Sequence, residues 1–319
     1  MEKDMNLLQL KKLKRSAAFI AAVALLFSVS TLSHAGRTYA KTENPIVLVH
    51  GFVGFDRVLG VDYWYGVANN LSRNGATVYT ANLSSVNGSD VRGEQLISFL
   101  EELKASYGHS KFNLIGHSQG GFDVRYAASV KPELVASVTA IGSPATGSGT
   151  AEFLLNTFGD DPLASTLIYN SLNLFGSLIE TLSGDTDPQN AVAAGHVLSY
   201  TGAAEFAVLH PQAMPTSPCG SRDHVVNGIP YYSWSGTKPF TNFLDATDYA
   251  LSITAKLDNE ESDGLAGRCA SHVGLTLRDN YKWNHVDQVN NLFGLRGWGS
   301  ANPLSVIRGH ANRLKNQGL

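Results

Sequence analysis

The sequence lacks the residues and motifs on which several common functions depend. Its 319 residues include only two cysteines, too few for a structural zinc site of the common types. It contains no H-E-x-x-H, no G-x-x-x-x-G-K-[S/T] and no G-x-G-x-x-G, the patterns typical of zinc proteases, phosphate-binding loops and dinucleotide-binding folds. It also has no internal repeat, no block of like charge in its main part and no long linker.

Positive charge is concentrated at the beginning of the chain. Five of the first fifteen residues are basic, an uncharged run follows over 16–33, and a small-x-small sequence ends at Ala35. We interpret residues 1–35 as a signal peptide, with Ala40 as the alternative cleavage position and Met5 as an alternative start. A membrane anchor is the competing interpretation, but 18 residues interrupted by serines and a threonine barely span a bilayer.

The remaining chain, 36–319, is long enough for one large α/β domain with a substantial core. The first fifteen residues carry a net charge of +3, so the net charge falls from −3 for the whole chain to near −6 without them. No basic cluster remains, which argues against nucleic acid as a partner. Both cysteines, Cys219 and Cys269, lie in the exported part and should form one disulfide, the alternative being two buried free thiols.

Apolar runs and helical periodicity alternate along the chain. Buried strands are predicted at 45–50, 77–83, 112–115, 135–141 and 231–234, and helices at 91–107 and 122–130. A further helix is expected near the C-terminus. Such alternation predicts an α/β fold with a mostly parallel central sheet, in which ligands bind at the carboxyl ends of the strands.

Gly116-His117-Ser118-Gln119-Gly120 matches G-x-S-x-G, the nucleophile elbow. The pattern alone is weak, because glycine and serine are abundant here. Its context strengthens it, since an apolar strand ends at Gly116 and a helical pattern without a breaker follows. Strand, elbow and helix are the arrangement of an α/β-hydrolase, so Ser118 is predicted to be the nucleophile. The alternative is a glycine-rich turn with a solvated serine.

The oxyanion hole of such a fold needs two backbone N–H donors. One belongs to the residue after the nucleophile, Gln119, and the other to the loop after the first buried strand, here Phe52. Because both donate through the backbone, their side chains are only loosely restrained.

The base and the acid follow the nucleophile in this fold, in the order acid, then histidine. The pattern favours His285, which lies in a polar and aromatic turn, over His272, and leaves four others with less support: His196, His210, His224 and His310. His310, in the expected C-terminal helix, suits a surface role. Asp263, in an Asp-Gly turn, is the favoured acid, with Asp245, Asp248 and Asp258 as competitors.

Several motifs together resemble one family. They are His50-Gly51-Phe52, Gly54-Phe55-Asp56, Gly60-Val61-Asp62-Tyr63-Trp64, Val91-Arg92-Gly93-Glu94-Gln95-Leu96, Asn113-Leu114-Ile115-Gly116-His117-Ser118 and Trp283-Asn284-His285-Val286-Asp287. The chain from about Pro45 to its C-terminal stretch resembles the Pseudomonas-type secreted, foldase-dependent triacylglycerol lipases of Gram-negative bacteria. The resemblance implies an α/β-hydrolase fold with a helical lid and the triad Ser118, Asp263 and His285.

The same resemblance implies further properties. One structural calcium ion would be held by Asp245, Asp287 and the backbone carbonyls of Asn291 and Leu295, which pins the His285 loop. The lid would lie at about 160–184, where the sequence alone permits an ordinary core helix equally well. We expect a secreted, monomeric enzyme that passes through the periplasm, uses a foldase and hydrolyses long-chain acylglycerols at an oil–water interface. A carboxylesterase for short esters and a non-catalytic binding protein are the alternatives.

Overall fold

The structure is a computed structural model, and it describes residues 38–54, 57–58, 61–158, 187–220 and 222–319. The expected signal peptide, 1–35, and the expected lid, 160–184, lie outside the described residues. Both therefore stay predictions from the sequence.

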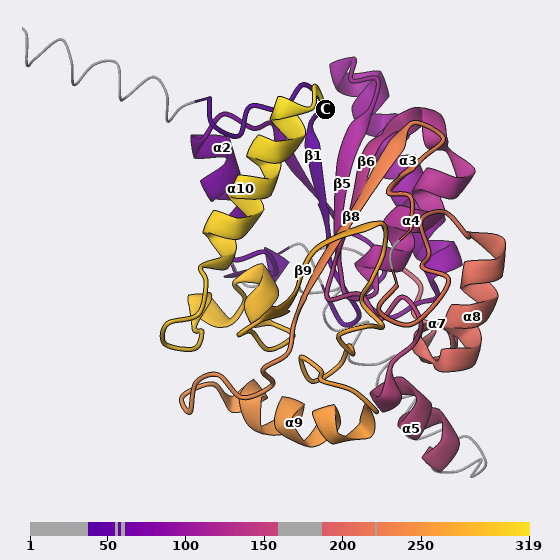
Figure 1. The fold of residues 1–319 in the computed structure, drawn as a ribbon. Coiled ribbons are helices and arrows are strands. Elements are labelled where there is room, and N and C mark those ends of the chain that lie inside the picture. Colours follow the sequence, from indigo (N-terminus) through magenta and orange to yellow (C-terminus); the bar gives the residue numbers. More distant parts are fainter. Residues whose placement is uncertain (1–37, 55–56, 59–60, 159–186, 221) are drawn as a thin grey trace, which may run out of the picture.

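A mostly parallel sheet forms the centre of the molecule (Figure 1). Its order is β4 (Val78–Ala81), β1 (Ile46–Val49), β5 (Phe112–His117), β6 (Val135–Ile141) and β8 (Ile229–Gly236), and β8 also pairs with β9 (Leu275–Tyr281). All of these pairs are parallel, whereas β7 (Val225–Val226) lies antiparallel to β8. Two short strands, β2 (Arg57–Val58) and β3 (Val61–Asp62), pair antiparallel apart from this sheet.

The apolar strands bury both faces of the sheet. In β1, Val47 and Val49 enter the core cluster that contains residues of α3 (Ser89–Tyr107) and α4 (Gly120–Val130). The alternate residues, Ile46 and Leu48, enter a second cluster with α2 (Val67–Arg73) and α10 (Pro303–Asn316). This alternation is what a two-residue strand period dictates. The sheet is therefore covered by helices on both faces, as a parallel sheet requires.

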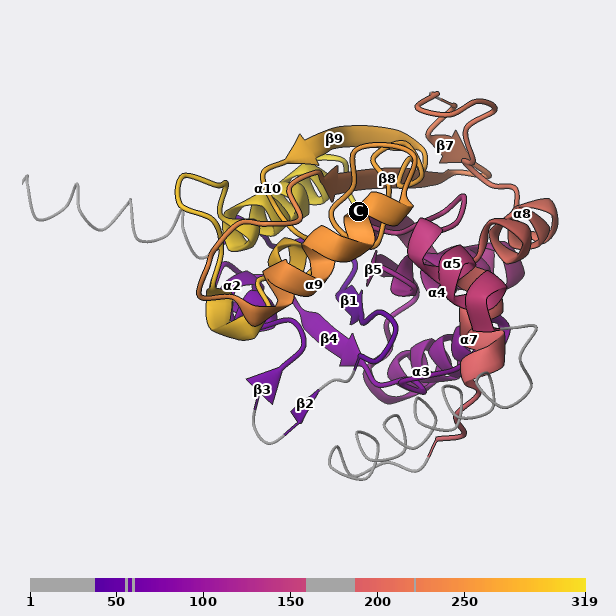
Figure 2. The same cartoon turned by 90° about the horizontal axis from the view of Figure 1, so that it is seen from below.

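The remaining helices are α5 (Gly149–Phe158), α7 (Ala191–Leu198), α8 (Tyr200–Leu209) and α9 (Ala246–Thr254). Viewed from below, α9 crosses in front of the strands (Figure 2). Single 3-10 turns occupy Pro132–Leu134, Ala255–Leu257, Asp287–Val289 and Leu292–Gly294. Among the described residues no single helix is long and apolar enough to cross a membrane. The pair α7 and α8, bent by 81°, reaches that length and composition only when the two helices are taken together.

The predicted strands and helices are confirmed, with ends that differ by a few residues, and 135–141 agrees in full. The expected C-terminal helix is present as α10. The surface role expected for His310 is wrong, because this side chain is only 1 % exposed. His310 lies on the same face of α10 as Ile307, Ala311 and Leu314, because residues three or four apart share one face of a helix. All four residues are buried, so this face packs against the sheet. One polar residue on an otherwise apolar face is buried with its neighbours.

Candidate active site

Ser118 lies in a tight turn between β5 and α4. Its φ of 55° is in the left-handed region that few non-glycine residues adopt, and its N–H donates to Ile141 O at 2.9 Å. A Cβ atom on Gly116 would lie 2.1 Å from Gly120 O, and one on Gly120 would lie 2.6 Å from Val49 O. The two glycines therefore permit backbone contacts that no side chain would allow, and the turn presents Ser118 at the end of its strand.

His285 and Asp263 are joined by a buried hydrogen bond. His285 Nδ1 lies 2.9 Å from Asp263 Oδ2, and the two side chains are 5 % and 0 % exposed. The backbone N–H of His285 also donates to Asp263 O at 2.9 Å. The acid thus holds the ring and the main chain of the histidine.

The carboxylate of Asp263 is bound by more than His285. Its Oδ1 accepts the backbone N–H groups of Leu265 and Ala266 at 3.0 and 2.8 Å, which is the Asx turn of the Asp-Gly sequence. Its Oδ2 also accepts Gln288 Nε2 at 2.5 Å. Sequence reasoning missed Gln288. Its place three residues after His285, on the same turn, is the only signal for it in the sequence.

His117, the residue before Ser118, brings the elbow into contact with His285. The rings of His117 and His285 lie 4.6 Å apart. The Asp263–His285 pair therefore lies beside the turn that contains Ser118, although these residues come from distant parts of the chain.

The two expected oxyanion donors follow two neighbouring strands. Phe52 follows β1, and Gln119 follows β5 as the N-cap residue of α4, with a fully buried side chain that donates to Asn87 O at 2.7 Å. Within the described residues, neither backbone N–H has a hydrogen-bond acceptor. Both donors lie just after the carboxyl ends of parallel strands, where ligands bind in this class of fold.

A buried cation holds the loop that contains Phe52. Arg92 donates to His50 O at 2.7 Å and to Ser84 O at 2.5 Å, and it pairs with Asp123 at 2.8 Å with neither side chain exposed. Burial raises the pKa of Asp123, while Arg92 opposes that shift. This contact orients the His50–Gly51 peptide, which immediately precedes the peptide that carries the Phe52 N–H.

The other histidines considered from the sequence have partners elsewhere. His272 Nε2 lies 3.2 Å from Asp279 Oδ2, and His310 Nε2 lies 2.9 Å from Thr139 Oγ1. The remaining three have neighbours of their own: His196 with Glu205, His210 with Phe206, and His224 with Tyr232.

Two buried carboxylates near His285 have an oxygen without a partner. Asp245 and Asp287 are each 1 % exposed, and among the described residues Asp245 Oδ2 and Asp287 Oδ1 accept no hydrogen bond. Burial raises the pKa of Asp287 to about 7, and the charges of Asp248 and Asp245 add to the shift. Unpaired buried oxygens of this kind are costly unless a cation binds them, so these residues fit the ligand set of a calcium ion.

The competing acids have other roles. Asn284 connects Asp248 to the His285 turn, since its Nδ2 donates to Asp248 Oδ1 at 2.5 Å and its Oδ1 accepts the Asp287 N–H at 2.7 Å. Asp258 Oδ1 accepts the N–H of Gly149 at 2.9 Å.

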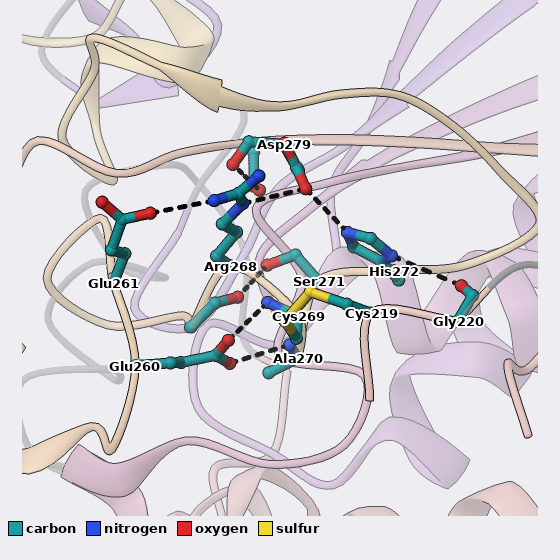
Figure 3. The surroundings of a disulfide bond; sticks show 12 residues. Cys219, Gly220, Glu260, Glu261, Arg268, Cys269, Ala270, Ser271, His272 and Asp279 are labelled. Atoms are coloured by element: carbon teal, nitrogen blue, oxygen red, sulfur yellow. Dashed lines mark hydrogen bonds and ion pairs between the residues drawn. A yellow bond between two sulfur atoms is a disulfide. The ribbon is translucent and has the colours of Figure 1, made fainter. Parts of the chain in front are cut away.

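The disulfide between Cys219 and Cys269 is confirmed, and it closes a loop of 50 residues. Figure 3 shows Glu260 beside it, accepting the N–H groups of Cys269 and Ala270 at 2.7 and 3.0 Å. Arg268 joins Asp279 at 2.9 Å and Glu261 at 3.0 Å. The loop that contains Asp263 is thus fixed by covalent and ionic contacts.

The chain is similar to known proteins in both sequence and fold. A family model described as alpha/beta hydrolase fold matches residues 44–288. The chain is 42 % identical over 293 residues to a triacylglycerol lipase of Vibrio cholerae, covering 92 % of this chain and 93 % of that protein. It is 39 % identical to a triacylglycerol lipase of Burkholderia plantarii, covering 93 % of both, and 36 % identical to one of Pseudomonas fragi, covering 88 % and 98 %.

Among solved structures, Staphylococcus hyicus lipase shares the fold, with a TM-score of 0.61, 17 % identity, and coverage of 87 % of this chain and 97 % of that one. The expected resemblance to bacterial triacylglycerol lipases is confirmed by the sequence relatives. The chain belongs to the α/β-hydrolase family and, within it, to the triacylglycerol lipases that these relatives represent.

Proposed function

We propose that this protein is a triacylglycerol lipase that acts through Ser118, His285 and Asp263. The observation that carries the proposal is the buried bond between His285 Nδ1 and Asp263 Oδ2 in the site of a strained serine. Because the carboxylate accepts the hydrogen of Nδ1, Nε2 is left free to accept the proton of Ser118.

The reaction then follows from the chemistry of each group. Ser118 Oγ attacks the ester carbonyl while His285 Nε2 takes its proton, and the N–H groups of Phe52 and Gln119 stabilise the oxyanion. Imidazolium returns the proton to the departing alcohol, which leaves an acyl-enzyme. Water, activated by the same imidazole, hydrolyses that ester and releases the fatty acid.

Ser118→Ala tests the assignment. A fluorophosphonate probe should label the parent and not the variant, and kcat on tributyrin should fall on the order of 10⁶-fold, as expected for a nucleophile that acts as a unit with its base. Unchanged melting of the variant would show that the fold is intact. Persistent labelling would assign the nucleophile to another residue.

A series of esters distinguishes a lipase from a carboxylesterase and from a binding protein. Rates on tributyrin, trioctanoin and triolein emulsions are compared with the rate on a soluble short ester. A lipase retains its rate on the long-chain emulsions, a carboxylesterase acts on the soluble ester alone, and a binding protein acts on neither.

We also propose one structural calcium ion held by carboxylates of Asp245 and Asp287 and the carbonyls of Asn291 and Leu295. Support comes from the unpaired buried oxygens of the two aspartates. When bound, the ion would neutralise the buried carboxylates and fix the turn that contains His285.

Export through the periplasm, a foldase partner and a monomeric state complete the proposal. The basic and apolar N-terminal sequence and the disulfide support export. Ala40 is fully buried and its N–H donates to Asn74 O at 2.8 Å, which favours cleavage after Ala35 over cleavage after Ala40. N-terminal sequencing of the secreted protein tests this position.

A further inference from the structure

Two buried side chains, the hydroxyl of Tyr63 and the imidazole of His117, connect the segment after β3 to the backbone of His285. Tyr63 Oη lies 2.6 Å from His117 Nδ1, and His117 Nε2 lies 3.0 Å from His285 O. Tyr63 is 8 % exposed and His117 is 1 % exposed, so water competes little for these bonds. A Cβ atom on Gly51 would lie 3.0 Å from Tyr63 Oη and 2.7 Å from Ser118 Cβ, so the hydroxyl lies beside the nucleophile turn.

The chemistry of the partners fixes the direction of each bond. A carbonyl oxygen only accepts, so His117 Nε2 must carry the hydrogen that binds His285 O. A neutral imidazole has one N–H, which makes Nδ1 the acceptor and the Tyr63 hydroxyl the donor. Burial lowers the pKa of His117 well below its ordinary value, and the charge of His285 adds to the shift, in agreement with a neutral ring.

The main chain of His285 is consequently held on both sides of its Cα atom. Its N–H donates to Asp263 O at 2.9 Å, and its C=O accepts from the residue that precedes Ser118. A displacement of about 1 Å in a reacting group can cost about 100-fold in rate. Contacts that fix the backbone of the base therefore bear directly on catalysis.

We propose that Tyr63 and His117 are positioning residues for His285, with the Tyr63 hydroxyl fixing the His117 tautomer whose Nε2–H holds the His285 carbonyl. Without that hydroxyl the hydrogen is free to move to Nδ1. Two acceptors, Nε2 and the carbonyl oxygen, would then face each other, and the His285 turn would shift. The proposal rests on the proposed function, because it takes His285 as the base.

Tyr63→Phe removes the hydroxyl and keeps the ring. We expect kcat on a soluble short ester to fall roughly tenfold with KM unchanged, because the substrate pocket is retained while the base is misplaced. Tyr65→Phe is the matched control, since Tyr65 is two residues away and 37 % exposed, and the rates of this variant should equal those of the parent. A raised KM at unchanged kcat would make Tyr63 a substrate contact and overturn the proposal.

A double-mutant cycle tests the route through His117. Glutamine retains an amide donor near the Nε2 position and cannot change tautomer, so Tyr63→Phe should cost less than about twofold in a His117→Gln background. An undiminished tenfold loss in that background would contradict the proposal.

The tautomer is also measured without activity, by ¹⁵N NMR of histidine-labelled parent protein, with His117 assigned through His117→Gln. We expect a protonated Nε2 in the parent and a mixture of tautomers in Tyr63→Phe. A parent protonated at Nδ1 would overturn the proposal. An inactive parent with the expected tautomer would instead contradict the proposed function alone.

Discussion

Three buried histidines lie in surroundings that oppose their charge. Burial, with Arg92 nearby, lowers the pKa of His50 to about 3, and burial lowers that of His117 as well. His310 has a pKa lowered to about 3 by burial and by Arg313, and it packs on the rings of Tyr232 and Trp234. The unfolded chain protonates these rings near pH 6.5, whereas the native state does not. Acid should therefore favour unfolding.

His310→Gln should reduce this sensitivity. Between about pH 6 and pH 4 the unfolded state binds a proton at His310 that the native state excludes. Each unit by which the pH falls in this range therefore lowers the free energy of unfolding by about 1.4 kcal/mol. The variant should lose that part of the slope, measured by urea unfolding at several pH values with calcium held constant. His196→Gln, at a half-exposed histidine, is the control. Parallel slopes for the parent and the His310 variant would show that His310 does not titrate in this way.

At the scale of elements, the strand–elbow–helix unit depends on backbone contacts at glycine. Gly116→Ala should destabilise the protein by several kcal/mol, because its Cβ would lie 2.1 Å from a rigid backbone oxygen. Gly309→Ala, in α10, has nothing within 4 Å of the added Cβ and should stabilise by about 0.5–1 kcal/mol through helix propensity. Thermal unfolding of both variants checks the pair. Equal effects of the two substitutions would refute the steric account of the elbow.

The loop around Asp263 depends on the disulfide. Closing a 50-residue loop stabilises by about 4 kcal/mol in the chain-entropy model. Cys219→Ser, Cys269→Ser and the double variant should lose the same amount, because each removes one bond, and their activity should fall before the rest of the protein unfolds. A double variant much less stable than either single variant would point to separate roles for the two sulfurs.

At the scale of the molecule, calcium bound beside His285 should stabilise the whole fold against unfolding. A ligand that binds only the native state stabilises by RT ln(1 + [L]/Kd). Chelator should lower the melting temperature and calcium should restore it. Asp287→Asn should remove most of this response, while Asp223→Asn, at an exposed aspartate, should retain it. Identical melting of the parent with and without chelator would argue against the ion.

The layers of the molecule and the place of the proposed nucleophile follow from local patterns in the sequence. Strands such as 135–141 are continuous apolar runs, and the elbow is a local pattern of glycine around serine, so both can be recognised from near neighbours in the chain. The relationship to lipases was also recognisable from several short motifs. Local patterns could only rank the candidate bases and acids, because the signals that favour His285 and Asp263 are turn residues, which are common along the chain.

Which polar groups meet depends on how the strands and helices pack together. Asp263 and His285 are 22 residues apart, Tyr63 and His117 are 54 apart, and His117 and His285 are 168 apart. These pairs form because parallel strands deliver their carboxyl ends to one edge of the sheet, a property of strand order and not of any local pattern. The burial of His310 has the same origin, since a helix face becomes interior only when the sheet packs against it.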